Sequence, residues 1–327
     1  MVGKRRRSRS TGRGRTIEAR CGDRGAPHCV GRPVASAFVV SVRGSHPSRA
    51  RGGPPTLDPL TGFADAHVHL QGYGAAERDA LLRRARAAGV VLVLAVANDV
   101  ASAAATMELA RASRHRPDWP RIHPGVGWHP RSARVPTDDE MATLERMLVD
   151  PLAPFIGEVG LDDTSPIGIA IQRVFLERFI ELSAAHDRPL NLHVRGADSI
   201  AWSADRVAAA GVRAIVHYFT GDPALARAIL DAGLWISVGR PVLRRENGPL
   251  REAVRTTVPL HRLTIETDAY PLPGRATEPA DVVGVTRAIA DLRRCSIEMV
   301  RVATNAALQE ALGASFAWTS SGGSAPP

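Results

Sequence analysis

The sequence predicts an α/β protein: a (β/α)8 TIM barrel preceded by a disordered basic extension. From residue 63 onward, short runs rich in Val, Ile and Leu alternate with longer segments of helical periodicity. Eight such runs fall within about 250 residues, which matches the strand number and length of a TIM barrel. An open, doubly wound sheet is the competing fold, but no glycine-rich phosphate-binding loop follows the first strand.

The elements follow one another along the chain without a large insertion. The predicted strands are Phe63–Val68, Val90–Ala97, Ile122–Trp128, Phe155–Val159, Pro189–His193, Ala214–His217, Trp235–Val238 and Leu263–Thr267. The predicted helices are Glu77–Ala88, Ala101–Arg114, Asp138–Leu148, Gln172–His186, Ser199–Ala210, Pro223–Ala232, Ala280–Leu292 and Ser296–Leu312. These elements place the barrel domain at residues 61–313 and leave a flexible tail at 314–327.

The segment before the barrel, residues 1–60, has a different composition. It is rich in Arg, Ser, Gly and Pro, and buries too little apolar surface to offset its ordering entropy. It holds 13 Lys and Arg against 3 Asp and Glu, whereas residues 61–327 carry a net charge of −1. The high pI therefore describes the extension and not the domain. The extension either contacts phosphate backbones non-specifically, serves in targeting, or reflects a misassigned start codon.

Cysteine usage and hydropathy bear on where the protein works. The three cysteines, Cys21, Cys29 and Cys295, form no CxxC pair, which argues against a disulfide framework and favours a reducing cytoplasm. No apolar run approaches the roughly 20 residues that cross a bilayer, so no membrane association is expected. We expect a monomeric, cytoplasmic protein.

Six potential metal ligands sit at the carboxyl ends of five predicted strands, where TIM-barrel enzymes place their chemistry. They are His67, His69, Glu158, His193, His217 and Asp268. Each alone has a structural explanation: a histidine at a strand end is often a hydrogen-bonded structural residue, and an aspartate after a strand can cap a helix. Their joint placement at one end of one barrel predicts a metal site.

The spacing and chemistry of the six residues suggest which metals they bind. Residues i and i+2 of a strand share a face, so His67 and His69 can both point into the barrel mouth. Imidazoles mixed with carboxylates suit Zn2+, Mn2+, Co2+ or Fe2+ better than an all-oxygen Mg2+ cage. Six ligands exceed the needs of one tetrahedral zinc. We therefore expect two divalent ions (Zn, Mn, Co or Mg) bridged by Glu158.

The motifs around these residues resemble the TatD family of metal-dependent deoxyribonucleases, within the amidohydrolase-like barrels. The resemblance runs from residue 63 to about residue 313. It is carried, in the family's order, by FADAHVHL, GVGWHP, IGEVGLD, QRVFLERFIELSAAHDRPLNLHVRGA, VHYFTG and IETDAYPL. All six predicted ligands match the family's ligand positions.

The resemblance also implies roles for further residues. Arg195 matches a position near substrate phosphate, with a structural ion pair as the alternative. His129 is expected to contact substrate or to stabilise its loop. Glu266 alternates with Asp268 and is expected to support it, while Asp162 matches a GLD motif with a contact or loop-ordering role.

The chain departs from the family pattern beside three of the motifs. The family usually reads HSRDA where this chain has His193 to Ala197, ETDSP where it has Glu266 to Tyr270, and Cys where it has Tyr218. The metal ligands are retained, whereas the substrate contacts are open to change.

The expected reaction is metal-assisted hydrolysis of a phosphodiester, with single-stranded DNA as the expected substrate. Asp268 and Glu158 are the expected catalytic residues, Asp268 as general base. Two alternatives remain: an amidohydrolase-type enzyme acting on an amide, lactone or ester, and a metal- or nucleic-acid-binding protein without turnover. A carbamylated lysine bridge, common in such amidohydrolases, is disfavoured because the chain has almost no Lys and Glu158 occupies that place.

Overall fold

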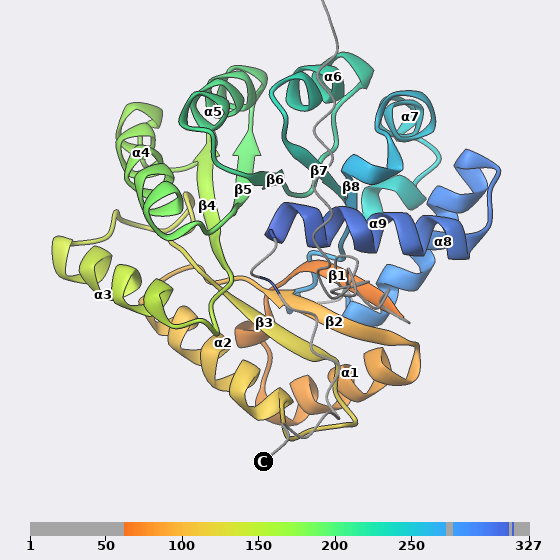
Figure 1. Cartoon of the computed structure of the whole chain (residues 1–327), viewed down its shortest axis with the longest axis horizontal. Coiled ribbons are helices and arrows are strands. Elements are labelled where there is room, and N and C mark those ends of the chain that lie inside the picture. The colour runs from red at the N-terminus through yellow and green to blue at the C-terminus, as the bar shows by residue number, and fades with distance from the viewer. Residues whose placement is uncertain (1–61, 273–276, 314–315, 317–327) are drawn as a thin grey trace, which may run out of the picture. The chain divides into compact units, whose positions relative to one another are not determined.

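Eight parallel strands alternate with helices in a nearly closed barrel, which confirms the predicted fold class (Figure 1). The computed structural model describes residues 62–272, 277–313 and 316. The predicted extension at 1–60 and, apart from residue 316, the predicted tail at 314–327 lie outside the described residues. Within the described chain, no helix combines the length and hydropathy that crossing a bilayer requires.

The strands pair in sequence order, each parallel to the next. They are β1 (Phe63–Val68), β2 (Val90–Ala95), β3 (Arg121–Val126), β4 (Phe155–Asp162), β5 (Leu190–Arg195), β6 (Ala214–Val216), β7 (Trp235–Val238) and β8 (Leu263–Ile265). The helices are α1 (Ala75–Ala87), α2 (Val100–Ser113), α3 (Asp138–Val149), α4 (Ile169–His186), α5 (Ala197–Ala210), α6 (Pro223–Asp231), α7 (Gly248–Glu252), α8 (Val282–Arg293) and α9 (Ile297–Leu312).

Local sequence signals set several of these boundaries. Asp99 caps α2 by accepting a hydrogen bond from the Ser102 backbone N–H, and Thr137 caps α3 in the same way from Glu140. All eight residues of β4 are buried, because barrel strands have side chains packed on both faces. The short helix α7 was not predicted, since five residues beginning Gly-Pro show no helical periodicity.

Helix α9 packs across one end of the barrel (Figure 1). Its Leu308 and Leu312 join an apolar cluster with Leu94 of β2 and with Phe155 and Trp235, the first residues of β4 and β7. This cluster fills the amino-terminal end of the barrel interior. The polar residues are therefore left at the carboxyl-terminal end.

The barrel closes between β1 and the residues that follow β8. Val68 and Ala269 form a parallel bridge, and the Asp268 backbone N–H donates to His67 O at 3.0 Å. The fully buried Asp65 carboxylate reinforces this seam: Oδ1 accepts from the Thr267 N–H at 2.9 Å and Oδ2 from Thr267 Oγ1 at 2.5 Å. Burial raises the pKa of Asp65 well above its usual value, although the hydrogen bonds from Thr267 oppose that shift.

Replacing Thr267 with valine should lower the free energy of unfolding by about 1–3 kcal/mol, because a buried carboxylate oxygen loses its donor. Urea denaturation measures this change. Thr256→Val is the matched control: its hydroxyl, on an exposed surface, binds the Glu252 carbonyl, and we expect a change within about 0.5 kcal/mol. Equal stability of Thr267→Val and the wild type would show that the seam does not depend on this contact.

Candidate metal centre

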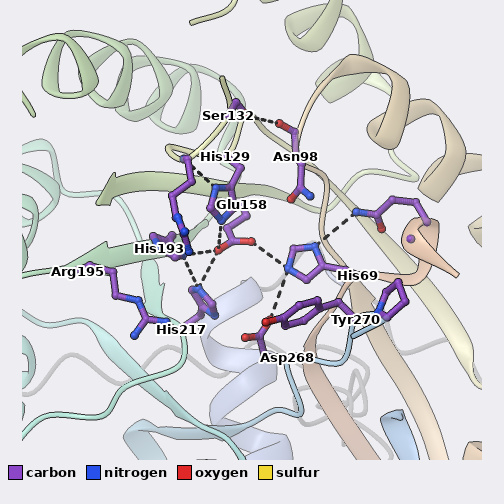
Figure 2. Close-up of a pocket in the computed structure, with 14 residues that line it drawn as sticks. His69, Asn98, His129, Ser132, Glu158, His193, Arg195, His217, Asp268 and Tyr270 are labelled. Carbon is purple, nitrogen blue, oxygen red and sulfur yellow. Dashed lines mark hydrogen bonds and ion pairs between the residues drawn. The ribbon is translucent and has the colours of Figure 1, made fainter. Parts of the chain in front are cut away.

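All six predicted ligands meet at the carboxyl end of the barrel. Glu158 and four of the others line a cavity of about 550 Å³ (Figure 2), while His67 is fully buried. His69, His217 and Asp268 follow β1, β6 and β8 directly or within three residues. Glu158 and His193, expected at strand ends, lie inside strands, because β4 and β5 pair onward as far as Asp162 and Arg195.

The two oxygens of Glu158 face two different groups of side chains. Oε2 lies 3.3 Å from His67 Nε2 and 3.2 Å from His69 Nε2. Asp268 Oδ1 completes this first group at 3.8 Å from His67 Nε2 and 3.5 Å from His69 Nε2. The first group therefore brings two imidazoles and two carboxylates together at one point.

The second group surrounds the other oxygen. Glu158 Oε1 lies 2.7 Å from His193 Nδ1 and 2.9 Å from His217 Nε2, and these two nitrogens are 3.1 Å apart. His129 Nε2 lies 3.2 Å from the same oxygen. The side chain of Glu158 thus stands between the two groups (Figure 2).

The first group fits a divalent cation. Ligand atoms about 2.0–2.1 Å from a tetrahedral ion are roughly 3.4 Å apart, close to the 3.2–3.8 Å between these atoms. Glu158 Oε2 is buried, and its polar neighbours among the described residues include the ring nitrogens of His67 and His69 at 3.3 and 3.2 Å, which a cation could bind together with it. Candidate metal groups include His67, His69 and Glu158 and, separately, His129, Glu158 and His193.

A further layer of side chains orients three of the imidazoles. His67 Nδ1 lies 2.8 Å from Asn191 Oδ1, His193 Nε2 lies 2.8 Å from Asp162 Oδ2, and His217 Nδ1 faces Glu266 Oε1 at 3.4 Å. Each of these oxygens favours the tautomer in which the outer nitrogen carries the proton, so the inner nitrogen can direct its lone pair at a cation.

Two of these contacts differ from the sequence predictions. Glu266 was expected to support Asp268, but it contacts His217 and accepts from the Tyr218 N–H at 2.7 Å. The alternation that suggested the pairing ends because Asp268 lies beyond β8 in a left-handed backbone conformation (φ 48°). Asn191 was missed, although it precedes His193 by two residues, and strand alternation places i and i+2 on one face.

His129 is oriented in the opposite sense. Its Nδ1 accepts the Arg131 backbone N–H at 2.9 Å, so the neutral ring carries its proton on Nε2, toward the cavity. Burial lowers the pKa of His129, which keeps the ring neutral, although Glu158 opposes the shift. His129 therefore presents a hydrogen-bond donor where the other imidazoles present acceptors.

Arg195 lies at the edge of the same cavity. In the part of the chain that the structure describes, it makes no ion pair, and its guanidinium lies over the Tyr218 ring, 5.5 Å from the centroid. The structural ion pair considered for Arg195 is not found there. Arg131, Ser132, Asn98, Gln71 and Tyr270 also line the cavity and were not singled out in the sequence.

Without a metal, the carboxylates hold protons on the imidazoles. Burial disfavours the charged ring of His69, but hydrogen bonds to Asp268 and Glu158 raise its pKa to about 9. His217 follows the same pattern: burial is outweighed by Glu158 and Glu266, and its pKa rises to about 10. The pKa of Glu158 falls well below its usual value because the imidazoles of His129, His217 and His67 outweigh its burial.

A barrel with imidazoles and carboxylates gathered at its carboxyl-terminal mouth is typical of the class of metal-dependent hydrolases. Comparison with known proteins identifies the family within that class. Residues 64–313 match the family model described as TatD related DNase. The chain therefore belongs to this family and is a metal-dependent hydrolase.

Individual relatives agree with this assignment. The uncharacterized metal-dependent hydrolase TatD of Mycobacterium tuberculosis is 35% identical over 265 residues, covering 77% of this chain and 98% of the relative. The 3'-5' ssDNA/RNA exonuclease TatD of Erwinia billingiae is 30% identical, covering 67% and 86%. The structure of the Escherichia coli TatD homologue YJJV has the same fold, with a TM-score of 0.67 at 24% identity over 75% of this chain and 96% of that one.

Metal binding should release protons. At neutral pH, His69 and His217, with pKa values of about 9 and about 10, carry protons that must leave before the rings can bind a cation. Apparent affinity should therefore rise with pH up to those values. Calorimetric titration with Mn2+ at about pH 7.5, in two buffers of different ionisation enthalpy, measures the release. Heats that do not depend on the buffer would contradict it.

Proposed function

We propose that this protein is a nuclease that hydrolyses phosphodiester bonds in single-stranded DNA, with two divalent cations held on either side of Glu158. The observation that carries the proposal is the division of the Glu158 oxygens between two groups, Oε2 toward His67 and His69 and Oε1 toward His193 and His217. A carboxylate that faces two ligand groups suits a bridging position. The monomeric state and the cytoplasmic location stay predictions.

The donor set indicates the kind of cation. Four imidazoles and two carboxylates suit Zn2+, Mn2+ or Co2+, and Mg2+ remains a candidate of lower fit. When bound, such cations supply a water of lowered pKa and neutralise charge on the attacking and leaving oxygens. The chain's own residues must place the phosphate and move the protons.

Asp268 is the proposed general base. Its carboxylate is partly exposed to the cavity, and Oδ1 lies 3.5 Å from His69 Nε2 at the edge of the first group. Burial would raise its pKa, but the hydrogen bond with His69 and the nearby imidazoles lower it, so the carboxylate is ionised at neutral pH. An ionised carboxylate at this position can accept the proton of an attacking water.

Arg195 and His129 are the proposed phosphate contacts. Both line the cavity on the side of the second group, and both present N–H donors rather than acceptors. A guanidinium fork matches two phosphate oxygens, and a neutral imidazole N–H donates to one. Neither role is required for an amide or lactone substrate.

The choice of nucleic acid rests on the relatives. The Erwinia billingiae protein is named as an exonuclease of single-stranded DNA and RNA, and a mouse relative, 29% identical, as a putative deoxyribonuclease. Both cover two thirds or more of this chain. The nucleic-acid substrate is proposed here on that similarity together with the phosphate-binding side of the cavity.

Asp268→Asn should reduce kcat on single-stranded DNA by about 10²–10⁴-fold, because an amide cannot accept the proton. Turnover is measured with Mg2+, Mn2+, Co2+ and Zn2+, with and without chelator, beside Asp291→Asn as an exposed control on α8. Full metal-dependent activity of Asp268→Asn would refute its role as base. Turnover of ester or lactone substrates, with none of DNA, would refute the nuclease proposal.

Arg195→Ala should raise KM for DNA and lower kcat/KM by roughly 10–100-fold, the range for losing a hydrogen bond between charged groups. Arg195→Lys should recover only part of this loss, because an ammonium cannot make the bidentate contact. Arg227→Ala, an exposed arginine of α6, is the control. An unchanged KM in Arg195→Ala would exclude the phosphate contact.

A further inference from the structure

The cavity above the metal centre has two chemically different sides. Arg195 lies on one side of Glu158, and Tyr270 on the other (Figure 2). Arg131, whose side chain is exposed, adds a second guanidinium to the lining, and Gly72 and Pro271 extend the surface formed by Tyr270. We call the surface of Gly72, Tyr270 and Pro271 the aromatic wall. It contains no charged side chain.

The Tyr270 ring is held near the metal centre but is not packed away. The residue is 38% exposed, and its ring lies at 85° to the His69 ring, with centroids 6.1 Å apart. Its backbone is fixed at both ends, because Tyr270 N donates to Thr277 Oγ1 at 3.3 Å and that hydroxyl donates to Tyr270 O at 3.0 Å. Thr277 is buried and is itself bound by the Tyr73 hydroxyl at 2.8 Å.

The rest of the wall is closely packed. A Cβ on Gly72 would lie 2.9 Å from Cδ of Pro271, so only glycine lets the two segments approach so closely. Gly72 follows the β1 motif and Pro271 follows the β8 motif. The wall is therefore built across the same seam that positions His67, His69 and Asp268.

We propose that the aromatic wall is a nucleobase subsite, in which the Tyr270 ring stacks on the base of a nucleotide beside the scissile phosphate. The inference rests on the proposed nuclease function and identifies what its substrate site recognises. An anchored, partly exposed aromatic ring loses little entropy on stacking and accepts any base, since every base has a π face. The phosphate chain then runs toward Arg131 and Arg195 on the opposite side.

This arrangement selects single strands. A base within a duplex is stacked on both faces and paired at its edge, so it cannot reach a wall beside a buried metal centre. An unpaired base can stack on Tyr270 while its phosphate lies over Glu158. Strand selection then comes from one ring and requires no sequence-specific hydrogen bonds.

The test combines side-chain and base removal. KM and kcat are measured for the wild type, Tyr270→Ser and Tyr270→Phe on a short oligo(dT), and on the same oligonucleotide with one abasic nucleotide moved through each position. Tyr270→Ser should raise KM about tenfold on oligo(dT). When the abasic nucleotide occupies the position that meets the wall, KM of the wild type should rise by about the same factor. KM of Tyr270→Ser should rise little further on that substrate. Tyr270→Phe, which keeps the ring, should resemble the wild type.

Two further variants separate stacking from structural damage. Met299→Ser removes another exposed apolar side chain, on α9, and should leave both substrates unaffected. Gly72→Ala keeps Tyr270 but displaces Pro271 and should weaken only base-containing substrates. Thermal unfolding establishes that each variant is folded.

The outcomes separate failure of the base subsite from failure of the proposed nuclease function. The base subsite alone is overturned if the wild type is an active nuclease and Tyr270→Ser raises KM equally on the intact and on every abasic substrate. It is also overturned if Tyr270→Ser raises KM on neither. Absence of wild-type nuclease activity with every metal overturns both. If Tyr270→Ser is unfolded, Tyr270→Leu replaces it, with the same selective loss expected.

Discussion

The structure depends on one buried carboxylate shared between two groups of imidazoles. Glu158 is 1% exposed, and its oxygens lie within 2.7–3.3 Å of five histidine nitrogens. An isolated carboxylate would not remain charged at such depth. It does so because positive charge lies close by, as the protons of His69 and His217 in the metal-free protein or as cations that the histidine nitrogens can bind. The requirement for charge balance therefore couples the stability of this interior to its chemistry.

The contacts that close the barrel are the same contacts that set the geometry of the site. Asp65 binds Thr267, and the backbone of Asp268 binds that of His67, so the chain that completes the barrel also carries the proposed base. Around this seam, Asn191, Asp162 and Glu266 orient the imidazoles. A shift of β1 against β8 would separate His67 and His69 from Asp268. Closure of the barrel, which usually contributes to stability, here also sets the spacing between the candidate ligands.

The sequence predicted the strands and the convergence of the six candidate ligands well because both follow short-range periodicities. β1 and β7 have the predicted bounds, and His67 and His69 lie together as the i, i+2 rule requires. The prediction for Glu266 was wrong because that rule ends where the strand ends, and the left-handed backbone of Asp268 turns its side chain elsewhere. The roles of Arg131 and Tyr270 were not predictable from periodicity, because they lie on loops whose course depends on tertiary contacts.

Charge distribution explains how a domain of slightly negative net charge can present a surface to a polyanion. Residues 61–327 carry a net charge of −1, but Glu158 is buried among histidines and Asp268 is only partly exposed, while Arg131 and Arg195 lie at the cavity edge. A nucleic acid would thus meet guanidinium groups before any carboxylate. Fields of this kind act over about a Debye length of 8–10 Å, so local placement outweighs net charge. The uncharged aromatic wall opposite then lets one strand bind in one orientation, phosphates toward the arginines and base toward Tyr270.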